Sequence, residues 1–149
     1  MICTANLTLI LFVHKNHTCL NCYLFNAQSI ISKLDELHHI LYTVQIDCVF
    51  ITETWLSSNV SDGLLDPRSE FTIVRHDRSG GRGGGVCVII KKSYTIIPFN
   101  ISTSFDHLEV VGFDIVNAVP PVRVFVVYRP PYYDDAAVRY ANSLIEFFY

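Results

Sequence analysis

A strand, a helix and a second strand follow one another early in the chain, and this order constrains the fold most. Leu20 to Phe25 is an apolar run typical of a strand. The segment from Ile30 to Leu41 has apolar residues at helical spacing, and Ser29 stands where it can cap that helix. Asp47 to Thr52 is a second strand-like run. The pattern predicts a βαβ unit with two parallel strands, and therefore an α/β fold.

Two polar residues end the predicted strands. Asn26 follows the first strand and Glu53 follows the second. Because parallel strands end at the same edge of a sheet, we expect this amide and this carboxylate to lie close together. Amide and carboxylate oxygens suit a hard cation such as Mg²⁺. A core strand followed by a solvated turn would explain the run from Asp47 to Leu56 without any site.

A stretch rich in arginine and glycine follows. Between Arg75 and Lys92 there are five basic residues and one acid, in a chain with a net charge of −3. A glycine loop with arginines at positions 75, 78 and 82 can bring backbone amides and guanidinium groups to phosphates. It is not a Walker loop, because no Gly-Lys-Ser/Thr follows and no helix begins there. A mobile hairpin loop is the alternative interpretation.

The rest of the chain predicts more strands and one helix. Glu109 would lie on the opposite face of its strand from Leu108 and Val110. The Asp106-His107 pair invites a catalytic interpretation, but neighbours on a strand point to opposite faces, so a surface turn is favoured. The further strands are expected at 71–75, 86–90, 94–98, 108–115 and 122–128, and the helix at 136–149.

Composition indicates one folded domain. The chain has 149 residues, of which 50% are hydrophobic and 17% charged. The negative net charge argues against a globally basic nucleic-acid-binding protein. Five cysteines is an odd number, and Cys48 and Cys87 lie in apolar runs, which indicates reduced thiols in a cytoplasmic or nuclear protein. Cys19-x-x-Cys22 has no second pair of cysteines, whereas structural zinc sites need four ligands.

Residues 1–19 are expected to be an N-terminal extension or to add an extra strand, with the domain proper at residues 20–149. The apolar run at 7–13 is too short to span a bilayer, and a basic start and a clear cleavage site are lacking. We therefore expect no membrane association.

Four motifs, in order, resemble the endonuclease/exonuclease/phosphatase superfamily. The closest resemblance is to the apurinic-type endonuclease domain of non-LTR (LINE-like) retrotransposons, specifically its N-terminal portion. The match runs from about Leu20 to the C-terminus. The motifs are Asn-Ala-Gln-Ser-Ile at 26–30, Ile-Thr-Glu-Thr-Trp-Leu at 51–56, the arginine and glycine segment at 75–86, and Val-Tyr-Arg-Pro-Pro at 127–131.

The resemblance implies a two-sheet α/β sandwich with outer helices and metal-dependent nicking of DNA. Asn26 would orient the site, Glu53 would bind Mg²⁺ or Mn²⁺, and Tyr128 would hydrogen-bond near the scissile phosphate. Arg78, Arg82 and Arg129 would contact phosphates. DNA would be the substrate, and a reverse transcriptase domain would lie downstream in the parent element.

The sequence departs from the family pattern in its later motifs. It contains no Gly-Asp-Phe-Asn and no Ser-Asp-His, and Gln28 replaces the usual arginine. We therefore expect a partial sandwich without its C-terminal half, inactive alone, so that whether the chain is an enzyme stays open. The alternatives are a non-catalytic phosphate- or nucleic-acid-binding remnant and a phosphoesterase for a small phosphate. An in-frame downstream Gly-Asp-Phe-Asn and reverse transcriptase would favour the endonuclease.

Overall fold

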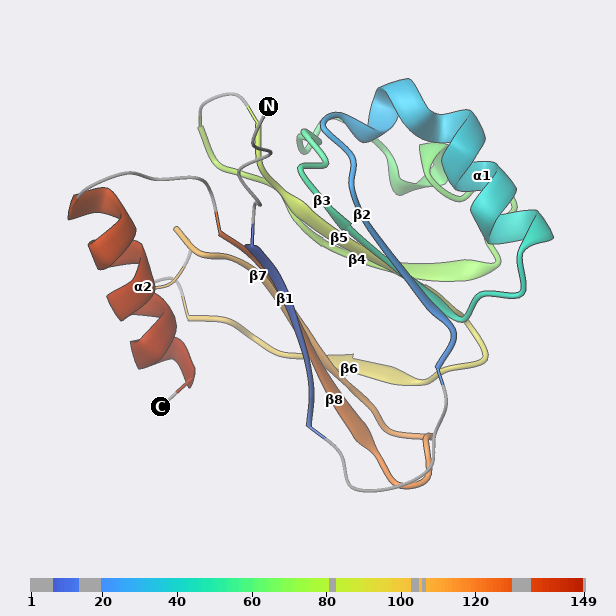
Figure 1. Ribbon diagram of the computed structural model, residues 1–149. Helices are drawn as coiled ribbons and strands as arrows, with labels where there is room; N and C mark the ends of the chain where they lie inside the picture. The colour runs from blue at the N-terminus through green and yellow to red at the C-terminus, as the bar shows by residue number, and fades with distance from the viewer. Residues whose placement is uncertain are drawn as a thin grey trace.

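Two four-stranded sheets lie face to face in the computed structural model, with a helix on each outer side (Figure 1). The structure describes residues 7–13, 20–80, 83–102, 105, 107–129 and 135–148. The first sheet has the strand order β1 (Leu7–Val13), β8 (Val122–Arg129), β7 (Glu109–Ile115), β6 (Ile96–Pro98). The second has the order β2 (Cys22–Asn26), β3 (Cys48–Thr52), β5 (Val86–Lys91), β4 (Phe71–His76). The predicted two-sheet α/β sandwich is confirmed.

The βαβ unit forms as the sequence indicates. β2 and β3 are parallel, and Asn26 stands beside Thr52 at their carboxyl ends. The chain between them forms a 3₁₀ turn, η1 (Ile30–Lys33), and then the helix α1 (Leu34–Thr43). Parallel pairing across a helical connection brings the two strand ends to one edge, as the pattern requires.

The prediction that Ser29 caps this helix is wrong. Ser29 has a φ of 86° and makes no capping hydrogen bond with its side chain. Its backbone N–H instead donates to the carbonyl of Glu53 at 3.0 Å. Its own carbonyl accepts a hydrogen bond from the Ser32 hydroxyl at 2.9 Å. The contact with the neighbouring strand end therefore decides the backbone at Ser29, and the first turn is 3₁₀ rather than a capped α-turn.

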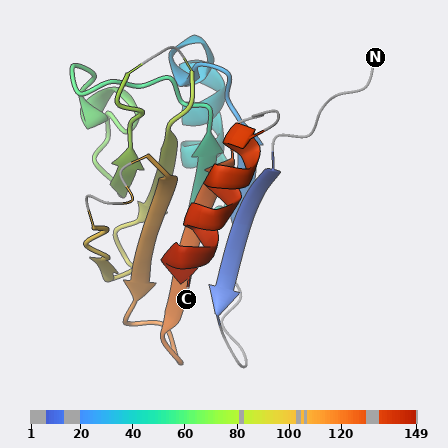
Figure 2. The same ribbon diagram turned by 90° about the vertical axis from the view of Figure 1, so that its left-hand side faces the viewer.

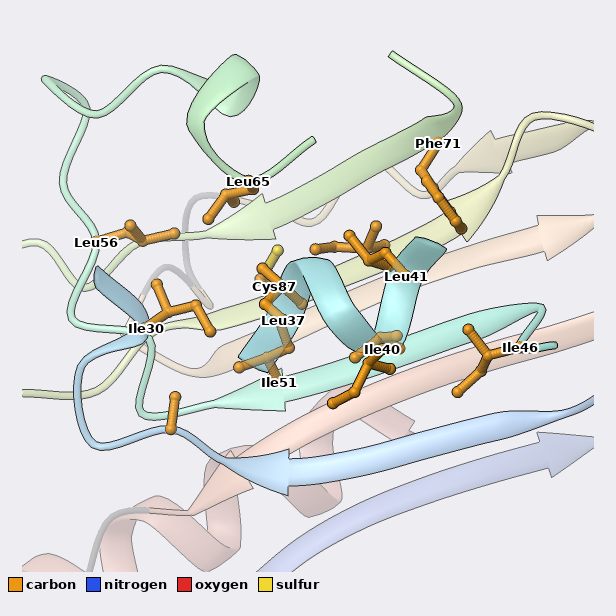
Figure 3. Close-up of a cluster of buried hydrophobic side chains, with 13 residues drawn as sticks. Ile30, Leu37, Ile40, Leu41, Ile46, Ile51, Leu56, Leu65, Phe71 and Cys87 are labelled. Carbon is orange, nitrogen blue, oxygen red and sulfur yellow. The ribbon is translucent and has the colours of Figure 1, made fainter. Parts of the chain in front are cut away.

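The helix α1 covers the outer face of the second sheet. Leu37, Ile40 and Leu41 are buried at the i, i+3, i+4 spacing of one helix face. They pack with Ile51 and Cys87 from the sheet, in a cluster that contains only apolar side chains and one thiol (Figure 3). Fully burying a side chain of this size stabilises the fold by about 1.5–3 kcal/mol.

A second apolar layer lies between the sheets. On β5, Cys87 and Ile89 face α1, whereas Val86, Val88 and Ile90 face the interior. This alternation is the two-residue period of a strand that is buried on both faces. The first sheet contributes alternate residues of β7 and β8 to the same layer, from Val111 to Ile115 and from Val122 to Tyr128.

The helix α2 (Asp135–Phe148) lies against the outer face of the first sheet (Figure 2). Tyr140 is buried there with Leu108, Val110 and Val127. The Tyr140 hydroxyl donates to the carbonyl of Tyr128 at 2.6 Å. The helix is therefore fastened to the end of β8 as well as packed on the sheet.

Two further strands differ in how well they match the sequence-based predictions. The run at 7–13 forms the antiparallel neighbour of β8, so the extra-strand alternative is the one that the structure shows. The strand predicted at 94–98 is shorter, because Ser93 and Tyr94 belong to a turn before Ile96. Among the described residues, no helix is long and apolar enough to cross a membrane. Asp106 and Cys19 lie outside the described part of the chain.

The described cysteines are free thiols, as expected. Burial raises the pKa of the Cys48 and Cys87 thiols well above the ordinary range. Burial, followed by the charge of Asp47, raises the pKa of Cys22 to about 11. At neutral pH these three thiols are therefore protonated in the metal-free chain.

Candidate functional site

Three loops meet at the carboxyl ends of β2 and β3, and we call residues 26–30, 53–56 and 83–85 the rim. The loop after β2 is hydrogen-bonded to the loop after β3 at three successive points. Ala27 N–H donates to Thr52 O at 2.8 Å, Ser29 N–H to Glu53 O at 3.0 Å and Ile30 N–H to Thr54 O at 3.0 Å. The loop that holds Asn26 and the loop that holds Glu53 are therefore fixed relative to each other.

The glycine segment before β5 closes the rim on its other side. The backbone N–H of Trp55 donates to the carbonyl of Gly84 at 2.9 Å, and the backbone N–H of Thr54 donates to the carbonyl of Gly85 at 3.4 Å. Gly85 has a φ of 87°, and a Cβ there would lie 2.4 Å from the Thr54 hydroxyl oxygen. Only glycine allows so close an approach without a shift of the buried threonine.

Strained backbone is concentrated at the rim. Left-handed φ values occur at Gln28 (47°), Ser29 (86°), Glu53 (54°) and Trp55 (55°). Ser69 is the only other non-glycine residue with positive φ in the described part of the chain. Such conformations cost about 1–3 kcal/mol each and persist only where surrounding contacts impose them. The interloop hydrogen bonds are those contacts here, and strain of this kind is typical of functional sites.

The carboxylate of Glu53 has two fixed donors on one oxygen. Oε2 accepts from the Trp55 indole N–H at 2.5 Å and from the Gly84 backbone N–H at 3.0 Å. One donor is a backbone N–H, and the other belongs to a rigid indole ring. The side-chain conformation of Glu53 is therefore set by its neighbours before any ligand arrives, which is what an oriented metal ligand requires.

Asn26 presents an oxygen that lacks a partner. Its Oδ1 is buried and accepts no hydrogen bond from any part of the chain that the structure describes. Buried polar atoms are normally satisfied, so an orphan here calls for a specific explanation. A buried amide oxygen without a partner among the described residues, at a strand end next to the loop that holds a carboxylate, is the kind of hard oxygen ligand that a divalent cation takes. No cluster of three or more His, Cys, Asp or Glu side chains suited to a metal occurs among the described residues.

Tyr128 and Glu109 approach the rim from the other sheet. They are cross-strand neighbours on β8 and β7, and both face the space between the sheets. Tyr128 is fully buried, and its hydroxyl has no hydrogen-bond partner among the described residues. Glu109 Oε2 accepts the backbone N–H of Gly85 at 2.5 Å, which places this pair directly behind the glycine segment.

The arginines differ in what they contact. Arg75 forms an ion pair with Asp62 at 3.2 Å and donates to the carbonyl of Val60 at 2.7 Å. Arg78 donates from Nε to Glu109 Oε1 at 2.7 Å and from Nη2 to the same oxygen. Arg129 is half-buried at the end of β8, and Arg82 lies outside the described residues. The phosphate contacts predicted for Arg78, Arg82 and Arg129 stay predictions.

The structure brings together residues that the sequence presents far apart. Asn26 ends β2 beside Thr52, so its backbone lies next to the residue that precedes Glu53. That the two side chains share a ligand stays a prediction. The participation of Glu109, and of the Trp55 indole as a donor to Glu53, is new. Glu109 does interrupt an apolar strand pattern, which is a signal of a special residue. Its partners could not be inferred, because they are 24 and 31 residues away on the other sheet.

The fold and the rim define a two-sheet α/β protein with a candidate polar site at the carboxyl ends of its parallel strands, the edge where α/β sheets bind ligands. The chain belongs to the endonuclease/exonuclease/phosphatase family, whose sequence model matches residues 21–147. Members of this family hydrolyse phosphodiesters or phosphate esters and generally use divalent metal ions. No curated protein and no solved structure matches the chain.

Proposed function

We propose that this chain supplies the metal-binding and phosphate-facing part of a DNA-nicking endonuclease of the kind carried by non-LTR retrotransposons. The observation that carries the proposal is the hydrogen bond from the Trp55 indole to the Glu53 carboxylate. Both residues belong to the Thr-Glu-Thr-Trp-Leu motif at 52–56, which resembles the motif of the retrotransposon branch. The tryptophan that marks the branch thus orients the acid expected to bind the metal.

Asn26 Oδ1 and the Glu53 carboxylate would hold Mg²⁺ or Mn²⁺. When bound there, the ion polarises a phosphoryl oxygen and offsets developing negative charge. The Gly84 N–H and the Trp55 indole keep Glu53 in one orientation. The Tyr128 hydroxyl, buried without a partner among the described residues, would donate to a phosphate oxygen.

The metal site is tested by terbium luminescence, because Trp55 is the only tryptophan of the chain. Tb³⁺ is a hard cation that prefers oxygen ligands, and a bound ion beside the indole would emit when tryptophan is excited. We expect sensitised emission that Mg²⁺ displaces and that Glu53→Gln abolishes. The matched control is Glu70→Gln, which changes an exposed glutamate away from the rim and should leave the emission unchanged. Absence of sensitised emission from the folded wild-type chain would contradict the proposal.

Nicking activity of the 149-residue chain is expected to be weak or absent. The sequence contains neither Gly-Asp-Phe-Asn nor Ser-Asp-His, which in the family supply further acid, amide and water-activating groups. Loss of a general base alone commonly costs a factor of about 10²–10⁴. Conversion of supercoiled plasmid to open circle in Mg²⁺ measures this activity. Robust nicking that disappears in Glu53→Gln would overturn the expectation of inactivity.

The substrate class is tested by fluorescence anisotropy with a labelled DNA duplex. We expect binding that weakens steeply with salt, because phosphate contacts release counterions. Arg129→Gln should weaken it, whereas Arg123→Gln, which changes an arginine near the opposite end of β8, should not. Failure to bind DNA together with binding of an inositol phosphate would favour the small-phosphate alternative.

A further inference from the structure

Glu109 is a buried charge that the roles assigned above do not use. Its relative exposure is 3%, and it begins β7 on the face directed toward the other sheet. An isolated carboxylate in such a position would be strongly destabilising. Its burial therefore depends on its partners, and those partners indicate what it does.

Both oxygens of Glu109 are bound by one hairpin of the opposite sheet. Oε1 accepts from Nε and Nη2 of Arg78, and Oε2 accepts from the Gly85 backbone N–H. Arg78 follows β4 and Gly85 precedes β5, so the two donors belong to the two sides of one connection. A single carboxylate on β7 thus ties the sheets together next to the rim.

The ion pair with Glu109 also places the Arg78 guanidinium against the backbone of Gly84, which is hydrogen-bonded to Glu53. A Cβ on Gly84 would lie 2.3 Å from the guanidinium carbon of Arg78, so the guanidinium packs directly on the Gly84 backbone. The N–H of this glycine is the one that donates to Glu53 Oε2. Only one glycine residue therefore separates the Glu109–Arg78 pair from the Glu53 carboxylate.

The strand behind Glu109 is itself anchored. The backbone N–H of Glu109 donates to the Tyr140 hydroxyl at 3.3 Å, and that hydroxyl donates to the carbonyl of Tyr128 at 2.6 Å. The helix α2 thereby fixes the backbones of Glu109 and Tyr128 together. If the backbone of Glu109 moved away from Gly85, its hydrogen bond to Tyr140 would break or Tyr140 would have to move with it.

We propose that Glu109 is a positioning residue, which holds Arg78 and residues 83–85 so that the Gly84 N–H orients the Glu53 carboxylate. The charge of Arg78 is offset by Glu109, and the main role of its guanidinium is to hold the backbone of residues 83–85 in place. The expected effect on metal affinity rests on the proposed function. The expected effect on the Trp55 environment rests only on the contacts of the folded chain.

The central experiment compares wild type with Glu109→Gln in two measurements. Glutamine has nearly the same shape, but it replaces one acceptor oxygen with an N–H₂ group and removes the charge opposite Arg78. Without metal, we expect Trp55 emission to shift to longer wavelength and to be quenched more readily by acrylamide, because the indole loses its fixed partner. With metal, we expect the apparent affinity for Tb³⁺ to fall by about tenfold, which is the scale for loss of residues that orient a ligand.

The matched control is Asp114→Asn. Asp114 lies at the opposite end of β7 and pairs through both carboxylate oxygens with Arg123, at 2.8 and 2.9 Å. The substitution makes the same kind of charge change on the same strand, away from the rim. Its Trp55 spectrum and its Tb³⁺ affinity should equal those of wild type.

A folded Glu109→Gln variant with wild-type Trp55 emission and wild-type Tb³⁺ affinity would overturn the proposal. If wild type binds no Tb³⁺ while Glu109→Gln still shifts the Trp55 emission, the proposed metal site fails but the positioning role stands. If Glu109→Gln does not fold, amide hydrogen exchange in the wild-type chain decides. The Gly85 amide should then be protected, and exchange as fast as that of exposed Gly80 would overturn the proposal.

Discussion

The cluster under α1 and the rim are neighbours along the chain, because β3 contributes to the cluster and the loop after β3 belongs to the rim, and they differ in how they are stabilised. Val49 and Ile51 are buried among apolar side chains with ordinary backbone geometry. Glu53, two residues further on, has a left-handed backbone and accepts hydrogen bonds from two other loops, at its carbonyl from Ser29 and at its carboxylate from Gly84. The cluster depends on shape and volume, so it tolerates compatible apolar residues. The rim depends on specific donors and on glycine, so it tolerates few changes.

The largest effect should come from the cluster. Leu37→Ala removes a fully buried side chain from the contact of α1 with the sheet and leaves a cavity. We expect a loss of about 2–5 kcal/mol in the free energy of unfolding, measured by urea denaturation. The control is Val44→Ala, an aliphatic truncation at a position that is 49% exposed, which should change stability by less than about 0.5 kcal/mol. Equal losses in the two variants would show that α1 is not packed as described.

Gly85→Ala should have the next largest effect, and it acts at the rim. Positive φ costs a non-glycine residue about 1–2 kcal/mol, and overpacking against Thr54 adds about 1–3 kcal/mol. We expect a total loss of about 2–5 kcal/mol and a weakened Tb³⁺ response.

The control for that variant is Gly80→Ala. Gly80 also has positive φ, 93°, but a Cβ there would meet nothing within 4 Å. Its cost should therefore be the backbone strain alone, about 1–2 kcal/mol, with the Tb³⁺ response unchanged. Identical urea curves for the two alanine variants would contradict the close packing of Gly85 on Thr54.

A smaller, pH-dependent effect on the free energy of unfolding is expected from the Tyr42–Asp66 hydrogen bond beside the cluster. The Tyr42 hydroxyl donates to Asp66 at 2.6 Å, and burial together with this hydrogen bond raises its pKa to about 12. Because the folded pKa lies above the ordinary value of 10.0, the contribution is complete below pH 10 and is lost as the pH rises toward 12.

Tyr42→Phe should therefore cost about 1–2 kcal/mol at neutral pH, through loss of the hydrogen bond to a carboxylate. The difference from wild type should shrink across the alkaline range, which denaturation at several pH values would measure. Tyr23→Phe, at an exposed position on β2, is the control and should show no such trend. A difference that stays constant up to pH 12 would refute the assignment.

The smallest effect should come from the exposed ion pair of Asp114 and Arg123. The hydrogen bond from Arg123 lowers the pKa of Asp114, so its contribution is present above the ordinary carboxyl pKa and is lost as the pH falls through the lowered value. Solvent screens so exposed a pair. Asp114→Asn should therefore change the melting temperature only slightly at neutral pH and less still in acid. A larger loss of stability than in Glu109→Gln would contradict the distinction between the two carboxylates of β7.

Much of the architecture followed from local pattern. Helical spacing in α1, alternation in the strands and the order strand–helix–strand are properties of neighbouring residues, so they could be predicted. The backbone position of Asn26, beside the residue that precedes Glu53, followed from the parallel pairing. The absence of a helix cap at Ser29 could not be predicted from the sequence, because a hydrogen bond to the carbonyl of Glu53 determines the backbone conformation of Ser29. The place of the first strand beside β8 depended on which sheet edge was open, which local pattern does not encode.

The sequence by itself determined the α/β class, the position of the strand ends, and the candidate pair of an amide and a carboxylate at one edge. Periodicity and chain direction suffice for these, because each depends on residues close together in the chain or on one pairing rule. Only the tertiary structure decided how the Glu53 carboxylate is oriented. The Glu109–Arg78 ion pair and the glycine backbone between it and Glu53 join segments of different sheets. Such contacts arise only when the two sheets pack, since no segment of the chain contains both partners.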